Sequence, residues 1–305
     1  MKSRCALVLG LGLSLLVSCG AKKKQTRHEQ AGHTIAAVNY PLAYFAERLA
    51  GDFATIVFEA PADEDPAFWK PTDEQIARIQ EADLILLNGA TYAKWAATTS
   101  LPLASTVDTS SSFRSPLLEV KGTVRHAHGK KDTEHSHART AFTTWLDLKQ
   151  AAAQARAVAD ALRKNWPDQA DAVMMNLAYL HTDLAKIDSR MRAATAKLKG
   201  VPVIASHPVY QYWERAYGLK ISSLLWEPEM DLNQDAMTDL KKLMDANPGA
   251  RHFIWEGDPL PENIEKLKAV GLTSVVISPC ANRPADGDFL TVMQRNSAAL
   301  ESLPN

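Results

Sequence analysis

The sequence predicts an α/β protein made of two similar lobes with parallel sheets, joined by one long rigid helix. Short apolar strands alternate with helical segments on both sides of residues 168–199, a pattern typical of parallel sheets covered by helices. Within residues 168–199, apolar residues recur at alternating steps of four and three, from Val173 to Leu198. This spacing places an apolar stripe along one side of a helix. We therefore expect an N-terminal lobe over residues 34–166, a linking helix over 167–200 and a C-terminal lobe over 201–305.

The linking helix has recognisable ends in the sequence. Pro167 and Asp168 are typical of a helix start, and Gly200 followed by Val201 and Pro202 is typical of a stop. At about 1.5 Å per residue the helix would be roughly 48 Å long, more than one small domain requires. A coiled coil would also suit the narrow stripe, but the flanking strands and helices favour a strut between two lobes.

The N-terminal lobe is predicted from four apolar strands and the helices between them. Strands are expected near residues 34–39, 53–59, 84–87 and 105–108. Helices are expected after Pro41, after Thr72-Asp73-Glu74-Gln75, around residues 92–98 and over residues 148–165. Residues 110–140 are rich in Ser, Lys and His, and they do not fit a packed core.

The C-terminal lobe repeats this arrangement. Strands are expected at residues 201–205, 221–226, 252–255 and 274–277. One helix is expected to end near residue 217, and three more are expected over residues 234–245, 262–270 and 289–300.

The N-terminus predicts export and a lipid anchor. Lys2 and Arg4 precede an apolar run over residues 5–17, which is too short to span a membrane but suits a signal peptide. The run ends in Leu16-Val17-Ser18-Cys19, which resembles the lipobox of bacterial lipoproteins. We expect a signal peptide at residues 1–18 and a tether at 19–33, held to membrane lipid by acylation of Cys19. A secreted protein with a chance cysteine is the alternative.

The composition limits the class of protein, its binding partners and its disulfides. The chain has 305 residues, 46% of them apolar, and a net charge of −1, which allows two ordinary cores and gives no basic groove for nucleic acid. With Cys5 removed and Cys19 acylated, Cys280 would have no partner for an intrachain disulfide. We expect a monomer on the periplasmic side or the cell surface.

Candidate binding residues lie where the predicted strands end, because ligands of open α/β sheets sit beyond the carboxyl ends of the strands. In the C-terminal lobe these are His207, Glu227 with Glu229, Glu256 with Asp258, and Ser278 with Cys280; in the N-terminal lobe they are Asn39, Asp63-Glu64-Asp65 and Asn88. One imidazole facing several carboxylates suits zinc or manganese. We take His207, Glu227 and Glu256 as the candidate metal ligands, although each of them could instead cap a helix or form a turn.

Four histidines in residues 110–140 are candidates for weaker metal binding. They form two His-x-His pairs, His126 with His128 and His135 with His137. Neutral imidazoles on a loop bind zinc weakly and reversibly. A solvated linker is the alternative.

Several landmarks resemble one known family across nearly the whole mature chain. They are Asp65-Pro66-Ala67-Phe68-Trp69-Lys70-Pro71-Thr72, Ala82-Asp83-Leu84-Ile85-Leu86-Leu87-Asn88-Gly89, the His-rich loop, Trp145-Leu146-Asp147, Ser206-His207-Pro208 with Tyr212 and Tyr217-Gly218, and Glu256. In these the chain resembles the zinc/manganese solute-binding lipoproteins of bacterial ABC importers (the ZnuA-like family). The resemblance implies two α/β lobes bridged by one long helix, a divalent metal as cargo and an ABC permease as partner.

The customary metal ligands of that family are mostly missing. Its pattern has histidines where this chain has Ala67 and Thr143, and a carboxylate where it has Ser278; His207 matches. Alanine cannot coordinate a metal and neutral hydroxyls are poor zinc ligands, so the usual site cannot form. Either the site is rebuilt from His207, Glu227 and Glu256, with help from Cys280 and the loop histidines, or the cleft has lost its metal. In the second case Trp69, Trp226 and Trp255, which also suit packed walls, leave room for an organic ligand.

The sequence therefore predicts a lipid-anchored solute-binding component of an ABC importer. It would capture a divalent metal, zinc more readily than manganese, and deliver it to a permease of the inner or cytoplasmic membrane. The alternative is a surface-binding or adhesin-like module whose cleft holds no metal or holds an organic ligand. The sequence contains no His-Glu-x-x-His, no Gly-x-Ser-x-Gly and no phosphate-binding glycine loop, so we do not expect an enzyme.

Overall fold

The computed structural model describes residues 32–113, 117–120, 125–126, 135–136 and 140–304. These residues belong to one compact unit, Gly32–Asn305. The expected signal peptide, the tether with Cys19, and the loop residues His128 and His137 lie outside the described residues.

The N-terminal lobe is built on a four-stranded parallel sheet with the order β2-β1-β3-β4. Its strands are β1 (His33–Ala37), β2 (Ala54–Val57), β3 (Leu84–Leu87) and β4 (Thr106–Asp108), and its helices are α1 (Tyr40–Ala50), α2 (Asp73–Gln80) and α3 (Leu148–Asn165). Asn39 caps α1 by accepting a hydrogen bond from the Leu42 amide, and Thr72 and Gln75 form a capping box on α2.

The C-terminal lobe has a second four-stranded parallel sheet, with the order β10-β9-β7-β8. Its strands are β7 (Pro202–Ala205), β8 (Lys220–Ser223), β9 (His252–Trp255) and β10 (Thr273–Val276), and its helices are α5 (Gln211–Tyr217), α6 (Gln234–Ala246), α7 (Pro261–Ala269) and α8 (Phe289–Ser302). The predicted fold class, two lobes with parallel sheets, is confirmed.

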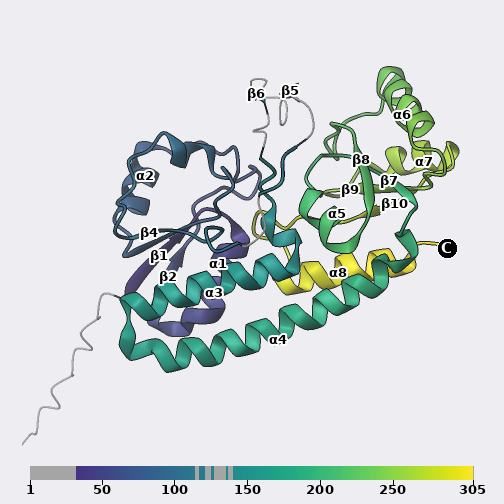
Figure 1. Ribbon diagram of the computed structural model, residues 1–305. Helices are drawn as coiled ribbons and strands as arrows, with labels where there is room; N and C mark the ends of the chain where they lie inside the picture. The colour runs from purple at the N-terminus through teal and green to yellow at the C-terminus, as the bar shows by residue number, and fades with distance from the viewer. Residues whose placement is uncertain (1–31, 114–116, 121–124, 127–134, 137–139, 305) are drawn as a thin grey trace, which may run out of the picture. The chain divides into compact units, whose positions relative to one another are not determined.

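The long helix α4 (Ala170–Thr195) connects the two lobes in the sequence and packs on helices of both (Figure 1). Short 3-10 turns, Pro167–Gln169 and Ala196–Leu198, extend it at either end. Its predicted apolar stripe is buried: Val173, Leu177, Leu180, Leu184, Ile187, Met191, Ala194 and Leu198. The stripe packs against α1, α3 and α8 of the same chain, as expected of a strut.

The segment between β10 and α8 also joins the lobes. The Tyr40 amide donates to the Ala281 carbonyl at 3.0 Å, and the Trp145 indole donates to the Pro279 carbonyl at 2.7 Å. Phe289 at the start of α8 packs edge-to-face on Phe45 of α1, with ring centroids 5.5 Å apart. This segment and α4 therefore both hold the lobes together.

Two local predictions need correction. The helix expected around residues 92–98 is only a 3-10 turn, Lys94–Ala97, because Ala93 has an extended backbone conformation (φ −63°, ψ 100°) that interrupts a helical path. The region expected to lie outside the core over residues 110–140 begins with Ser110, which is buried. Part of that region forms a small antiparallel ribbon of β5 (Arg125–His126) and β6 (His135–Ser136).

Trp69, Trp226 and Trp255, the three tryptophans considered for an organic ligand site, are all buried. Trp226 stacks on Phe253 with ring centroids 5.5 Å apart, and Trp255 packs on both rings. In the described part of the chain, no helix has both the length and the hydrophobicity needed to cross a bilayer.

Candidate metal centre

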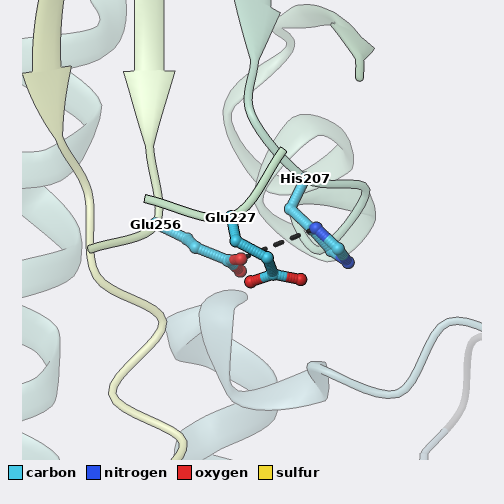
Figure 2. A group of neighbouring side chains, drawn as sticks. All are labelled: His207, Glu227 and Glu256. Carbon is cyan, nitrogen blue, oxygen red and sulfur yellow. Dashed lines mark ion pairs between the residues drawn. The ribbon is translucent and has the colours of Figure 1, made fainter. Parts of the chain in front are cut away.

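Three side chains meet where β7, β8 and β9 end. Ser206 and His207 directly follow β7, Glu256 directly follows β9, and Glu227 lies four residues beyond β8. The strands are parallel neighbours, so the loops at their carboxyl ends lie at one edge of the sheet. One ligand atom from each of His207, Glu227 and Glu256 lies within 4.8 Å of the other two (Figure 2).

Ser206 ties the three loops together. Its amide donates to the Ile254 carbonyl at 2.8 Å, its carbonyl accepts from the Trp226 amide at 2.8 Å, and its hydroxyl accepts from the Glu256 amide at 3.3 Å. The backbones that carry the three candidate ligands are thereby fixed through one residue. The sequence indicated Ser206 only as the neighbour of His207, and its bracing role was missed.

The imidazole is buried and faces a carboxylate. His207 is 1% exposed, and its Nδ1 lies 3.6 Å from Oε1 of Glu256. Burial raises the pKa of Glu256 well above its usual range, and the nearby carboxylates of Glu227, Asp65 and Glu229 raise it further. Because these carboxylates repel one another, a divalent cation placed among them would relieve their repulsion.

These residues line a cavity of about 340 Å³ that both lobes enclose. The N-terminal lobe contributes Asp65, Phe68, Tyr92, Phe142 and Thr143, and the C-terminal lobe contributes His207, Glu227, Glu256, Ser278 and Cys280. The cavity is larger than a bare metal ion and has room for water or for a small molecule bound with the ion.

Three positions where the family pattern has metal ligands, now Ala67, Thr143 and Ser278, are occupied by residues that pack or hydrogen-bond to the backbone. Ala67 is fully buried, and its carbonyl accepts from the Lys94 amide at 3.1 Å. The Thr143 hydroxyl donates to the Val209 carbonyl, and the Ser278 hydroxyl accepts from the Cys280 amide at 3.2 Å. Both hydroxyls are therefore committed to holding backbone segments, as expected for residues that do not bind metal.

Other candidates from the sequence lie apart from the three-residue group. Cys280 lines the cavity, but burial and Asp288 raise the pKa of its thiol to about 12, which disfavours the thiolate that binds metals. Asn39 and Asn88 hydrogen-bond to each other at 3.1 Å and support the N-terminal lobe. Glu229 and Asp258 are not members of the group.

The structure describes the loop histidines only in part. His126 and His135 occupy paired positions on β5 and β6, whereas His128 and His137 lie outside the described residues.

The fold and the cavity define a two-lobed solute-binding protein whose lobes are linked by one long helix. A family model described as "Zinc-uptake complex component A periplasmic" (ZnuA) matches residues 35–303, and the chain belongs to this family. The predicted family resemblance is confirmed. Members of this family are solute-binding proteins rather than enzymes.

Named relatives are distant in sequence. The chain is 22% identical to the zinc-binding lipoprotein AdcA of Streptococcus pneumoniae (strain ATCC BAA-255 / R6), over 99% of this chain and 61% of AdcA. It is 25% identical to the high-affinity zinc uptake system protein ZnuA of Bacillus subtilis (strain 168), over 68% of this chain and 66% of ZnuA. The chain thus spans less than two thirds of the length of these curated relatives.

Solved structures share the fold. The metal-dependent lipoprotein YcdH from Bacillus subtilis has a TM-score of 0.73 and 18% identity, covering 88% of this chain and 98% of YcdH. The solute-binding protein FpvC from P. aeruginosa, in complex with Ni2+, has a TM-score of 0.67 and 19% identity, covering 89% of this chain and 95% of FpvC. At this identity the similarity shows the fold alone.

Proposed function

We propose that this protein is the solute-binding component of an ABC importer and captures a divalent metal ion at His207, Glu227 and Glu256. The convergence of one imidazole and two carboxylates within 4.8 Å is the observation that carries the proposal. An imidazole with carboxylates is a donor set that zinc accepts, and manganese also tolerates oxygen-rich sites.

Zinc is the ion that the relatives' names favour. AdcA is named as zinc-binding and the B. subtilis relative as a zinc uptake protein. A permease of the inner or cytoplasmic membrane would receive the ion, and acylation of Cys19 would keep the protein at a membrane surface near that permease.

Equilibrium dialysis with zinc tests the proposal. Wild-type protein without a His tag should bind one zinc ion at the centre, and His207→Ala should lose most of that affinity because two carboxylates then lack their nitrogen donor. His181→Ala is the matched control, since His181 lies on α4 and contacts the Ala152 carbonyl at 3.0 Å. Equal zinc affinity in wild type and His207→Ala would contradict the proposal.

The loop histidines require a separate variant. We expect weak additional zinc binding to disappear when His126, His128, His135 and His137 are all replaced by Ala, while binding at the centre remains. Loss of the tight site in this variant would instead place the principal ligands on the loop.

A metal-free binding module is the second candidate. Phe68, Tyr92 and Phe142 line one side of a cavity far larger than an ion, which would suit an organic ligand. This alternative predicts that His207→Ala leaves organic-ligand binding intact and that the wild type purifies without metal.

A further inference from the structure

The outer edge of β8 carries unpaired backbone groups. β8 is the last strand of its sheet and is paired on one side by β7, with Ser223 opposite Ala205. The Leu224 amide donates to the Ala205 carbonyl at 2.9 Å. Successive residues of a strand form their backbone hydrogen bonds on alternate sides, so the amides of Ser223 and Leu225 point away from β7. In the described part of the chain, neither of these two amides has a hydrogen-bond partner.

The Ile221 amide, two residues before Ser223, points in the same direction. It donates to Oε1 of Glu214 on α5 at 3.2 Å and not to β7. This carboxylate covers the first amide along the edge and leaves the next two open. An open strand edge is a template for pairing with another extended chain.

The open edge lines a groove of about 1090 Å³. Residues 118–120, side chains of α5 and the first turns of α6 form its other walls. Leu225 is 36% exposed in this groove, and Val120, Leu219 and Met230 add apolar surface. An unpaired strand edge beside pockets for alternate side chains is the arrangement with which proteins bind an extended peptide as an added strand.

The charges around the groove are mainly negative. Its lining includes four carboxylates: Glu119, Glu214, Asp235 and Asp239. The cation among the lining residues, Arg215, is paired with Asp147 at 3.1 Å, and Asp239 is paired with Lys242 at 2.8 Å. The other three carboxylates make no ion pair within the described residues. A segment that carries lysine or arginine beside apolar residues would complement this surface.

We propose that the edge of β8 binds an extended segment of a partner protein as an added strand. Apolar side chains of the segment would lie in the groove, and its basic side chains would face the carboxylates. The groove does not include the three candidate metal ligands, so this inference goes beyond the function proposed above and does not depend on it.

Fluorescence polarisation with labelled synthetic peptides tests the inference. The peptides are about eight residues long, the length of an ordinary strand, and lysine alternates in them with valine or leucine. Two N-methylated versions keep every side chain, and each loses the backbone donors along one edge. The unmodified peptides should bind, and one of the two N-methylated versions should bind at least about tenfold more weakly because it cannot pair with β8. Equal binding of all three would overturn the inference.

Variants of the protein locate the binding site. Ser223→Pro removes an open amide but no bond to β7, and proline is tolerated on the open side of an edge strand, so peptide affinity should fall by about tenfold while the protein stays folded. Replacing two carboxylates together, Glu119→Gln with Asp235→Asn, should weaken binding several-fold and reduce its dependence on salt. Glu262→Gln is the matched control, because Glu262 is exposed on α7 and lies outside the groove; its affinity should stay within about twofold of wild type.

Three results would overturn the inference. The first is that no alternating peptide binds the wild type, and the second is an equal loss of affinity in the control Glu262→Gln. The third is that the protein alone sediments as a dimer that Ser223→Pro dissociates, because the edge would then pair with a second copy of the chain. Zinc affinity should be the same in Ser223→Pro and wild type, so a failure of the proposed metal capture is seen separately.

Discussion

At the scale of single residues, the centre depends on a few atoms that organise several loops. Ser206 joins the loops after β7, β8 and β9 through three hydrogen bonds, which bring the backbones of His207, Glu227 and Glu256 to one place. Such support of ligating side chains by their neighbours is general in metal sites. This arrangement also gathers like charges around the half-buried carboxyl group of Glu256.

Glu256→Gln should stabilise the metal-free protein and at the same time abolish tight metal binding. The pKa of Glu256 is raised by burial and by Glu227, Asp65 and Glu229, so its ionised form opposes folding at neutral pH. The neutral amide removes that penalty, and we expect the free energy of unfolding to rise by on the order of 1 kcal/mol. Denaturant titration at neutral pH measures this change.

Glu229→Gln serves as the control for that measurement. Glu229 is exposed and its charge is screened by solvent, so stability should change by less than about 0.5 kcal/mol. A destabilised Glu256→Gln would contradict the electrostatic account of the centre.

At the scale of elements, α4 fixes the relation between the two sheets. Its buried stripe packs on α1 and α3 of the first lobe and on α8 of the second, and the segment between β10 and α8 adds hydrogen bonds across the lobes. A continuous helix resists bending, so motion of the lobes about it should consist of small tilts rather than a wide hinge rotation. Closure on a cation therefore requires donors that already lie near one another.

Leu184→Ala tests the contribution of the stripe. Leu184 is 1% exposed at the middle of α4, and the variant should lose about 2–5 kcal/mol in free energy of unfolding because a cavity remains. Tyr179→Ala, on the same helix but 61% exposed, should change stability by less than about 0.5 kcal/mol. Similar losses in the two variants would show that α4 is not held by its stripe.

At the scale of the whole molecule, folding and metal binding respond to pH in opposite directions. The pKa of Glu256 is higher in the folded state than in the unfolded state. At pH values below the unfolded-state pKa, the carboxyl group is protonated in both states and does not affect the free energy of unfolding. As pH rises from there toward the folded-state pKa, Glu256 lowers the free energy of unfolding by a growing amount. Metal binding instead strengthens as pH rises, because metal ions bind the deprotonated forms of carboxyl and imidazole ligands.

Thermal melts with and without zinc should show this reversal. Between about pH 5 and pH 7.5, the metal-free wild type should lose stability relative to Glu256→Gln. Over the same range the zinc-induced rise in melting temperature should grow, because the stabilisation free energy approaches the roughly 2.7 kcal/mol expected when zinc is at 100 times its dissociation constant. An equal zinc-induced rise at both pH values would contradict a site made of imidazole and carboxylates.

The sequence by itself determined the fold class, most strand positions and the buried face of α4, because these follow from the periodicity of apolar residues. It also indicated His207, Glu227 and Glu256 as residues at strand ends. Only the tertiary structure decided that these three converge, that Ser206 braces them, and that Thr143 and Ser278 hold backbone instead. It likewise joined Asn282 to the loop that lines the cavity from the other lobe, through a hydrogen bond to the Glu64 carbonyl 218 residues away. Local sequence patterns encode periodicity, whereas the meeting of distant loops depends on how strands pair and lobes pack.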